Sequence, residues 1–287
     1  MTSRPHGFKR LVVGLHPTAS DRTMQLAVEL ADLLNLDLLG LFVEDSGLRD
    51  LAGHPFAREF RPLNGGWHPI DLDQLAADLD VAARCAERLF ADAVRGLSTK
   101  SRFEVVRGPT AQTIASLSQG GDIVLIVEPA SAVERIAQQF SWSKEAAFGS
   151  VAAVMLVPPQ VVRNVGPVIA IARSPLDSSL DVAAGIAAAA KEPLVVVRFD
   201  EGAADDARIR DIETALGLAV RQIHAGKSAQ SDPAAFAALL AELQERLIVA
   251  TREGVDSDFA ATVATARRVP VLVVEPVESE APPREQK

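Results

Sequence analysis

The sequence has little of what several classes of protein depend on. Its single cysteine, Cys85, excludes an internal disulfide and a cysteine-rich metal site, and it suits a reducing compartment. The five histidines show no metal-ligand spacing. No apolar stretch reaches the roughly 20 residues that a membrane-spanning helix needs, and Met1 to Arg10 lack the apolar core of a signal peptide. These absences predict a soluble cytoplasmic protein with no membrane partner and no metal.

Basic clusters and a catalytic nucleophile motif are also missing. Acidic residues outnumber basic ones by 38 to 29, the net charge is −9, and no run of Lys or Arg occurs, so nucleic acid is not an expected partner. His16, Ser20 and Asp21 superficially suggest a hydrolase triad, but no Gly-x-Ser-x-Gly turn presents a nucleophile. Cys85 has an apolar spacing within a helix, which predicts an inert buried thiol.

What the sequence does contain is a repeated order of short apolar runs and amphipathic segments. Between Leu11 and Asp45, two apolar runs of strand length flank a polar turn and an amphipathic segment, which is typical of a βαβ unit. The same order recurs from Val168 to Glu201. Hydrophobic residues make up 48% of the chain, enough to cover parallel strands on both faces. The pattern predicts an α/β fold in two tandem halves.

The remaining apolar runs extend each half to five strands. Later strands are expected at 103–106, 122–127, 152–157, 194–199, 218–223, 246–250 and 270–274. Helices are expected to cover 71–97, 110–117 and 132–148 in the first half and to end at 190, 216, 245 and 267 in the second. The predicted domains are 1–159 and 160–276, with a linker at 160–166 and a disordered tail at 277–287.

One segment, residues 46–70, occurs in the first half alone. It holds several glycines and three aromatic residues, Phe56, Phe60 and Trp67. A segment of this length suggests a lid that folds over the sheet edge or a cleft. Its aromatic side chains either line an apolar pocket or fix the segment to the core, and core packing is the favoured interpretation.

The order of these elements, twice over, resembles the universal stress protein family in its tandem form. The residues that carry the likeness are Leu11–Gly14, Ala27–Ala31, Leu41–Glu44, Gly108–Pro109 and Arg268–Val274. The resemblance implies two tandem Rossmann-like (HUP-type) domains, each a five-stranded, mostly parallel sheet with helices on both faces. It also implies an intramolecular pseudo-dimer, in which the last strands of the halves, near Val154 and Leu272, meet across a pseudo-two-fold axis.

The resemblance further points to adenine nucleotides, but the sequence departs from the family's pattern. Nucleotide-binding members carry an Asp after the first strand and a Gly-x-x-Gly, nine residues, Gly-Ser/Thr pattern after the fourth, where bare backbone and a helix N-terminus hold phosphate. Here His16 and Arg173 follow the first strands. Glu128 and Glu253 follow the fourth strands, and the glycines are missing in both halves. This departure argues against ATP binding by the motif in the first half and predicts at most weak binding in the second.

Ligands of open α/β sheets bind outside the carboxyl ends of the strands, which places the candidate residues there. The candidate ligand-binding residues are His16, Val43, Glu128, Arg173, Ser174, Thr251 and Arg252. Either these residues contact a ligand, or they are solvated turn residues and helix caps, as in any such fold. His16 with Glu128 could form a proton-transfer pair, although a His before Pro in a turn is more often a surface residue.

Three functional hypotheses follow. The first is a non-catalytic cytoplasmic stress-response or small-ligand-binding protein whose ATP motif is lost in both halves. The second is an adenine-nucleotide-binding regulator that replaces the glycine contacts with Arg173, Thr251 and Arg252. The third is an enzyme that uses residues 46–70 as its lid. No catalytic residue is assigned, the partner is an unidentified small molecule or protein, and a homodimer is left open.

Overall fold

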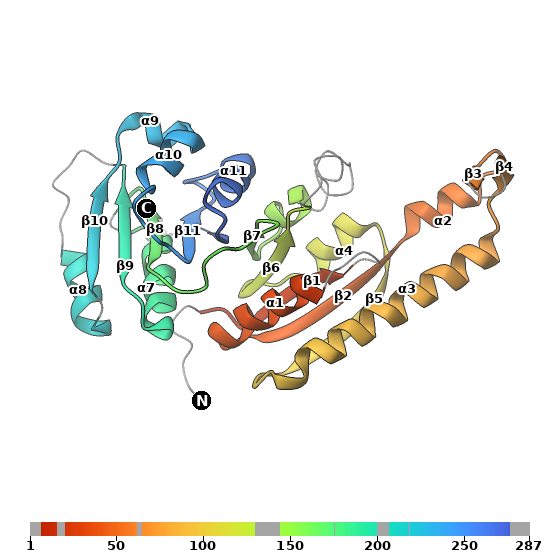
Figure 1. Cartoon of the computed structure of the whole chain (residues 1–287), viewed down its shortest axis with the longest axis horizontal. Helices are drawn as coiled ribbons and strands as arrows, with labels where there is room; N and C mark the ends of the chain where they lie inside the picture. The colour runs from red at the N-terminus through yellow and green to blue at the C-terminus, as the bar shows by residue number, and fades with distance from the viewer. Residues whose placement is uncertain are drawn as a thin grey trace, which may run out of the picture. The chain divides into compact units, whose positions relative to one another are not determined.

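The computed structural model describes residues 7–15, 21–61, 65–129, 144–174, 176–199, 207–217 and 219–275. Within these ranges the chain forms two compact units (Figure 1), and the division falls inside the strand at Ala153–Val157, between Met155 and Leu156; we describe this strand with the first unit. Each unit is described by itself. The boundary predicted at residue 159 stays a proposal.

The first unit is a sheet of five strands with β1 at its centre. The strands are β1 (Arg10–Leu15), β2 (Asp37–Asp45), β5 (Ser101–Gly108), β6 (Asp122–Val127) and β7 (Ala153–Val157), in the order β7-β6-β1-β2-β5. β1 pairs in parallel with β2 and β6, and β2 pairs in parallel with β5. The helices are α1 (Asp21–Leu33), α2 (Ser46–Ala52), α3 (Leu72–Ala93) and α4 (Thr110–Leu117), with a 3-10 turn η1 (Val94–Gly96). The strand order switches at β1: the chain first adds β2 and β5 on one side of it and then β6 and β7 on the other. This class of fold binds ligands at such a switch point, outside the carboxyl ends of the strands.

Helix α3 packs on β2 because β2 carries a glycine at the crossing point. A Cβ atom on Gly40 would lie 2.5 Å from Cδ2 of Phe90 and 3.1 Å from Cδ2 of Phe103. The two phenyl rings themselves pack with their centroids 5.8 Å apart. Gly40 therefore makes room for the aromatic contact that holds α3 against the sheet.

The second unit repeats the same strand order. Its strands are β8 (Val168–Ala172), β9 (Leu194–Arg198), β10 (Val220–His224), β11 (Leu247–Thr251) and β12 (Val271–Val274), in the order β10-β9-β8-β11-β12. All the pairings are parallel. The helices are α7 (Ser178–Ala190), α8 (Ala207–Leu216), α9 (Lys227–Ser231), α10 (Pro233–Leu239) and α11 (Ser257–Arg267). The predicted fold, two tandem Rossmann-like units with mostly parallel five-stranded sheets, is confirmed.

Helix α10 is shorter than predicted, because the chain turns inward to bury Glu245. The helix was expected to reach that residue but ends at Leu239, and 3-10-type bonds such as Leu243 N to Leu240 O follow. The Glu245 side chain is 0% exposed and accepts hydrogen bonds from Arg267 Nε at 2.7 Å and Nη2 at 3.0 Å. Arg163 Nη2 approaches the same carboxylate at 3.5 Å. Arg163 lies within the expected linker 160–166, which is therefore bonded to the second unit.

The segment 46–70 does not fold over the sheet, so the expectation of a lid is wrong. Figure 1 shows α2 continuing beyond the end of β2, and the hairpin of β3 (Arg58–Arg61) and β4 (Gly66–Pro69) lies at the far end of α3. We call α2, this hairpin, the turn that joins them and the first half of α3 (residues 46–80) the arm. The expected core packing of the aromatic residues is also wrong: Phe56 is 90% exposed, Trp67 64% and Phe60 52%.

Two further expectations about α3 need correction, and one is confirmed. Asp71 caps the helix as predicted, because its carboxylate accepts from the backbone N–H groups of Asp73 and Gln74. The predicted apolar face is only partly buried, since the first half of the helix extends past the sheet and Leu72 is exposed. Cys85 is exposed as well, so it is not the buried thiol that its spacing predicted.

Several predictions fall on residues outside the described ranges. They are His16, Ser20, most of the helix at 132–148, of which 144–148 are helical, and the tail 277–287.

Candidate functional site

At the strand ends of the first unit, the carboxylate of Glu44 is buried between two arginines. Glu44 follows the apolar part of β2 and is 3% exposed. Its Oε2 accepts from Arg107 Nε at 2.6 Å, at the end of β5, and from Arg49 Nη2 at 3.3 Å, in α2. The neighbouring Asp45 caps α2 by accepting from Gly47 N at 2.8 Å. These charged groups join β2, β5 and α2 to one another, which is a structural role.

The first unit's candidate ligand residues lie on both sides of β1. Val43 is half-buried in β2, where it pairs with Val106 of β5. Glu128 directly follows β6 and is buried. Since β1 separates β2 from β6, the two candidates flank the central strand. His16, the third candidate here, lies outside the described residues.

In the second unit, the structure brings the basic candidates to one edge of the sheet, the edge formed by the carboxyl ends of its strands. Arg173 and Ser174 follow β8 and are exposed, while Thr251 is buried at the end of the adjacent strand β11. Arg173 Nη2 donates to the carbonyl oxygen of Gly254 at 2.9 Å, which ties the two strand ends together. Gly254 also packs closely, because a Cβ there would lie 3.1 Å from Thr251 O.

Arg252 at this edge is bound to a carboxylate of its own chain. Its Nη1 lies 2.6 Å from Oε1 of Glu275, which follows β12. Burial lowers the pKa of the Arg252 guanidinium, and the charge of Glu275 acts in the opposite direction. The backbone oxygen of Glu275 accepts from the hydroxyl of Ser178 at the start of α7. The edge is thus a connected polar network in which the cations already have anionic or carbonyl partners.

The two helix N-termini at this edge are both closed by aspartate caps. Asp177 accepts from Ser179 N at 3.0 Å at the start of α7 and from Arg173 N at 3.0 Å. Asp256 accepts from Asp258 N at 3.0 Å and from Phe259 N at 2.7 Å at the start of α11. The first N–H groups of a helix are where an anion would bind, so both positions already hold a carboxylate.

Sequence reasoning missed Asp256, although a signal for it was present. An Asp directly before a helical segment is a preferred N-cap residue, and Asp256 precedes the helix that was expected to begin at 258. Arg49 was also missed, because it reaches Glu44 only through the folding of α2 against the end of β5, which no local pattern indicates.

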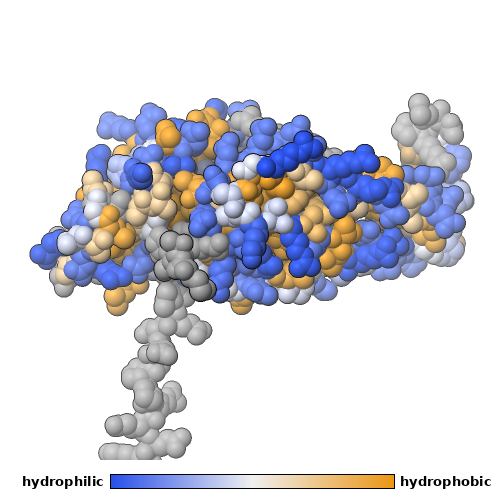
Figure 2. Space-filling model, turned by 90° about the horizontal axis from the view of Figure 1, so that it is seen from below, coloured by the Kyte–Doolittle hydropathy of each residue, from blue (hydrophilic) through white to orange (hydrophobic). Residues whose placement is uncertain are grey.

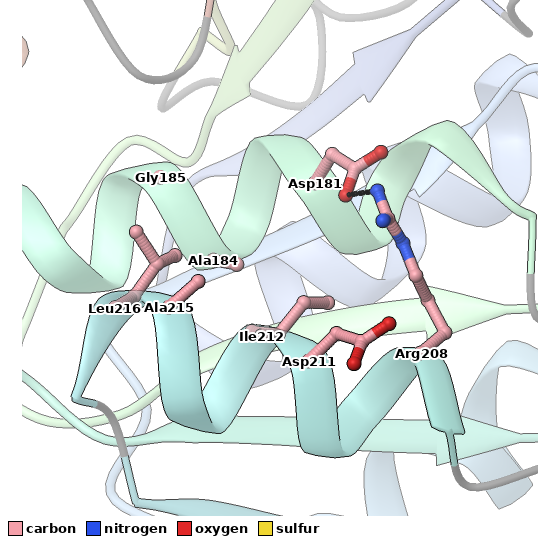
Figure 3. A pocket seen from close by; sticks show the side chains of 8 residues that line it. All are labelled: Asp181, Ala184, Gly185, Arg208, Asp211, Ile212, Ala215 and Leu216. Carbon is pink, nitrogen blue, oxygen red and sulfur yellow. Dashed lines mark hydrogen bonds and ion pairs between the residues drawn. The ribbon is translucent and has the colours of Figure 1, made fainter.

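A shallow recess of about 310 Å³ lies between α7 and α8 in the second unit. Figure 3 shows the small side chains Ala184 and Ala215 lining it, with Asp181 and Arg208 joined across one end. That ion pair measures 2.5 Å. The lining residues belong to two packed helices and include none of the candidate ligand residues. Its location does not suggest an active site.

The described part of the chain lacks two further kinds of site. No group of three or more His, Cys, Asp or Glu residues within the described ranges has a geometry that could hold a metal ion. Among the helices that are described, none is both long enough and apolar enough to span a bilayer.

Comparison with known proteins locates the fold but not a function. No family model and no curated protein matches the sequence. The chain is similar to the crystal structure of a universal stress protein from Archaeoglobus fulgidus DSM 4304, with a TM-score of 0.69, 16% identity, and 96% of this chain and 100% of that chain covered.

Two other solved structures share the fold at lower similarity. A functionally unknown protein from Pseudomonas aeruginosa PAO1 has a TM-score of 0.55 and 14% identity, with 95% of this chain and 94% of that chain covered. The cytoplasmic domain of a prokaryotic cation chloride cotransporter has a TM-score of 0.52 and 10% identity, with 93% and 96% covered. Proteins with different roles therefore use this architecture. The resemblance predicted from the sequence is confirmed at the level of the fold: the chain has the tandem fold of universal stress proteins.

Proposed function

We propose that this is a non-catalytic cytoplasmic protein, with a stress-response or small-ligand-binding role, that does not hold a nucleoside triphosphate at its strand ends. The observation that carries the proposal is the cap of α11. In the second unit this helix follows the fourth strand, where the phosphates of a nucleotide would be bound. The Asp256 carboxylate occupies its first free N–H groups at 2.7 and 3.0 Å.

The charge of the cap opposes a phosphate in the same place. Two negative charges about 4 Å apart repel by about 4 kcal/mol at an effective dielectric constant of 20. Glu253 and Asp258, both exposed, flank the cap and add to the repulsion. Arg173 and Arg252 offset it less than their charges suggest, because they already bond Gly254 O and Glu275.

The first unit supports the same conclusion with a different residue. Glu128 is buried at the matching strand end, directly after β6. A buried carboxylate there disfavours an adjacent triphosphate more strongly than an exposed one would, because less water screens the repulsion.

Isothermal titration of the full chain with ATP, ADP and AMP tests the proposal. We expect no binding tighter than about millimolar, and micromolar binding of ATP would refute it. Asp256→Asn is the matched variant, because asparagine is an equally good N-cap but carries no charge. If the carboxylate is what excludes phosphate, this variant should bind ATP more tightly than the natural chain.

A second candidate function is an adenine-nucleotide-binding regulator that uses the second unit. The observation in its favour is that Arg173, Thr251 and Arg252 meet at one edge of the sheet. If a nucleotide does bind, Arg252→Ala should weaken the binding measured by titration, and unchanged affinity would remove this candidate. The third hypothesis, an enzyme with Trp67 in its lid, has lost the structural feature on which it depended.

A further inference from the structure

The arm of the first unit carries an unusual concentration of exposed aromatic side chains. On the face drawn in Figure 2, hydrophilic residues predominate and hydrophobic ones lie in smaller patches between them. Among the described residues, every exposed aromatic side chain belongs to the arm: Phe56, Phe60 and Trp67. Leu51 and Leu72 of the same arm are exposed too. Clustered exposed apolar residues of this kind mark interaction surfaces.

The hairpin within the arm is oriented with its apolar side outward. Phe60 pairs directly with Trp67, their ring centroids are 5.5 Å apart, and both side chains are exposed. Glu59 pairs with His68 on the opposite side of the hairpin, and these two polar residues are half-buried. His68 Nε2 is buried without a hydrogen bond to any part of the chain that the structure describes.

This orientation is the reverse of what an isolated hairpin would adopt. A strand pair with one face in water normally turns its apolar residues inward, and a shift of one residue exchanges the two faces. A two-stranded hairpin is also marginally stable alone. The outward face, which we define as Arg58, Phe60, Trp67 and Pro69, therefore has the character of a surface that is covered by another molecule.

The charges around the outward face favour a second copy of this chain as that molecule. Residues 46–80 hold six carboxylates and three arginines, so an anionic membrane or a nucleic acid would be repelled. Both signs are present on the arm: Arg58 lies on the outward face, and Asp73 is exposed in the first turn of α3. A two-fold contact between identical surfaces must be self-complementary, which a surface of mixed charge satisfies.

The apolar area is also sufficient for such a contact. From their exposed fractions, Phe60 and Trp67 on the outward face leave roughly 250 Å² of apolar side chain in water. Two copies bring about 500 Å² together, and because apolar atoms make up about 57% of a typical interface, the whole contact is about 900 Å², close to the lower bound of about 1,000 Å² for a specific interface. A contact at this lower bound is typical of a weak, reversible dimer.

We propose that two copies of the chain associate through the arm, with the outward faces of the hairpins packed against each other. Phe60 and Trp67 form the centre of the contact, and Arg58 of each copy lies near Asp73 of the other. This inference is independent of the proposed function, because it uses no residue of the strand ends.

Sedimentation velocity of the full chain over a concentration series tests the dimer. We expect a reversible dimer, and Trp67→Ser should raise its dissociation constant at least about tenfold, because central aromatic residues dominate such contacts. Val105→Ser is the matched control, since Val105 is an exposed apolar residue of β5 in the same unit but outside the arm. Circular dichroism verifies that both variants are folded. A monomeric natural chain, or a dimer that Trp67→Ser leaves unchanged, would overturn the proposal.

A charge exchange tests the orientation of the two copies. Arg58→Asp should weaken the dimer, and adding Asp73→Arg to the same chain should restore it, whereas a double variant that stays monomeric contradicts the proposed pairing. Phosphatidylserine vesicles serve as the remaining test: if a monomeric natural chain sediments with them, the outward face contacts lipid and the dimer is refuted.

Discussion

Replacing the buried carboxylate of Glu245 tests how the second unit is held together. The side chain is 0% exposed and receives two hydrogen bonds from Arg267, at 2.7 and 3.0 Å, and a longer one from Arg163 at 3.5 Å. Glu245→Ala removes the anion and leaves two mostly buried guanidinium groups without their charge partner. Breaking a buried ion pair in this way usually costs about 3–5 kcal/mol of unfolding free energy.

The structure favours the lower end of that range for Glu245. Arg267 Nη2 keeps a bond to Leu243 O at 2.9 Å, and Arg163 keeps bonds to Arg267 O at 2.8 Å and to residue 245 O at 3.0 Å. These carbonyl oxygens continue to solvate the cations after the substitution. We therefore expect Glu245→Ala to lower the free energy of unfolding by about 3 kcal/mol. Glu245→Gln, which keeps the volume, should cost less.

Urea denaturation followed by far-UV circular dichroism measures this loss. With a slope of about 1–3 kcal/mol per molar urea, the midpoint of the second unit's transition should fall by about 1–3 M. Both tryptophans, Trp67 and Trp142, lie in the first half and the chain has no tyrosine, so fluorescence reports on the first unit alone. Asp181→Ala, which breaks a half-exposed pair with Arg208, is the control and should cost less than about 1 kcal/mol. A Glu245→Ala loss no larger than that of the control would refute the reasoning.

Two further predictions concern the first unit. Gly40→Ala should destabilise it by about 1–3 kcal/mol, because the added Cβ would lie 2.5 Å from the Phe90 ring, and tryptophan fluorescence in urea measures the change. Gly14→Ala is its control, since no atom lies within 4 Å of a Cβ there, and equal losses in the two variants would contradict the packing argument. Cys85 should react with a maleimide in the native protein as fast as in urea, because its side chain is exposed, and protection in the native state would contradict the exposed position.

The sequence predicted the fold well because the strands are short, fully apolar runs that recur in the same order. β6, β9 and β12 match their predicted positions within about a residue, the precision at which strand ends are defined. Periodicity identified the longer helices, but α2 and α9, of seven and five residues, were not predicted because so few turns show no clear period.

The sequence could not show how far a helix or hairpin extends beyond the sheet on which the chain packs. The apolar stripe of α3 predicted burial at Leu72, but periodicity does not show that the helix extends past the sheet. The same limit explains the wrong expectation for the hairpin aromatics. Cys85 has a different cause: it lies in the packed half of α3 between the buried residues Ala83 and Ala86, but outside the face that they form. At the strand ends, the missing glycines were visible in the sequence. The carboxylate of Asp256, which fills the anion position, became apparent only from its hydrogen bonds to α11.

The central claim, that the phosphate position of the second unit is filled by the chain's own carboxylate, is tested most directly by a crystal structure. The protein should be purified from cells without added ligand, so that any tightly bound nucleotide is carried into the crystal. We expect electron density for the Asp256 carboxylate on the N–H groups of Asp258 and Phe259. Density for a phosphate group on those two N–H groups would contradict the account.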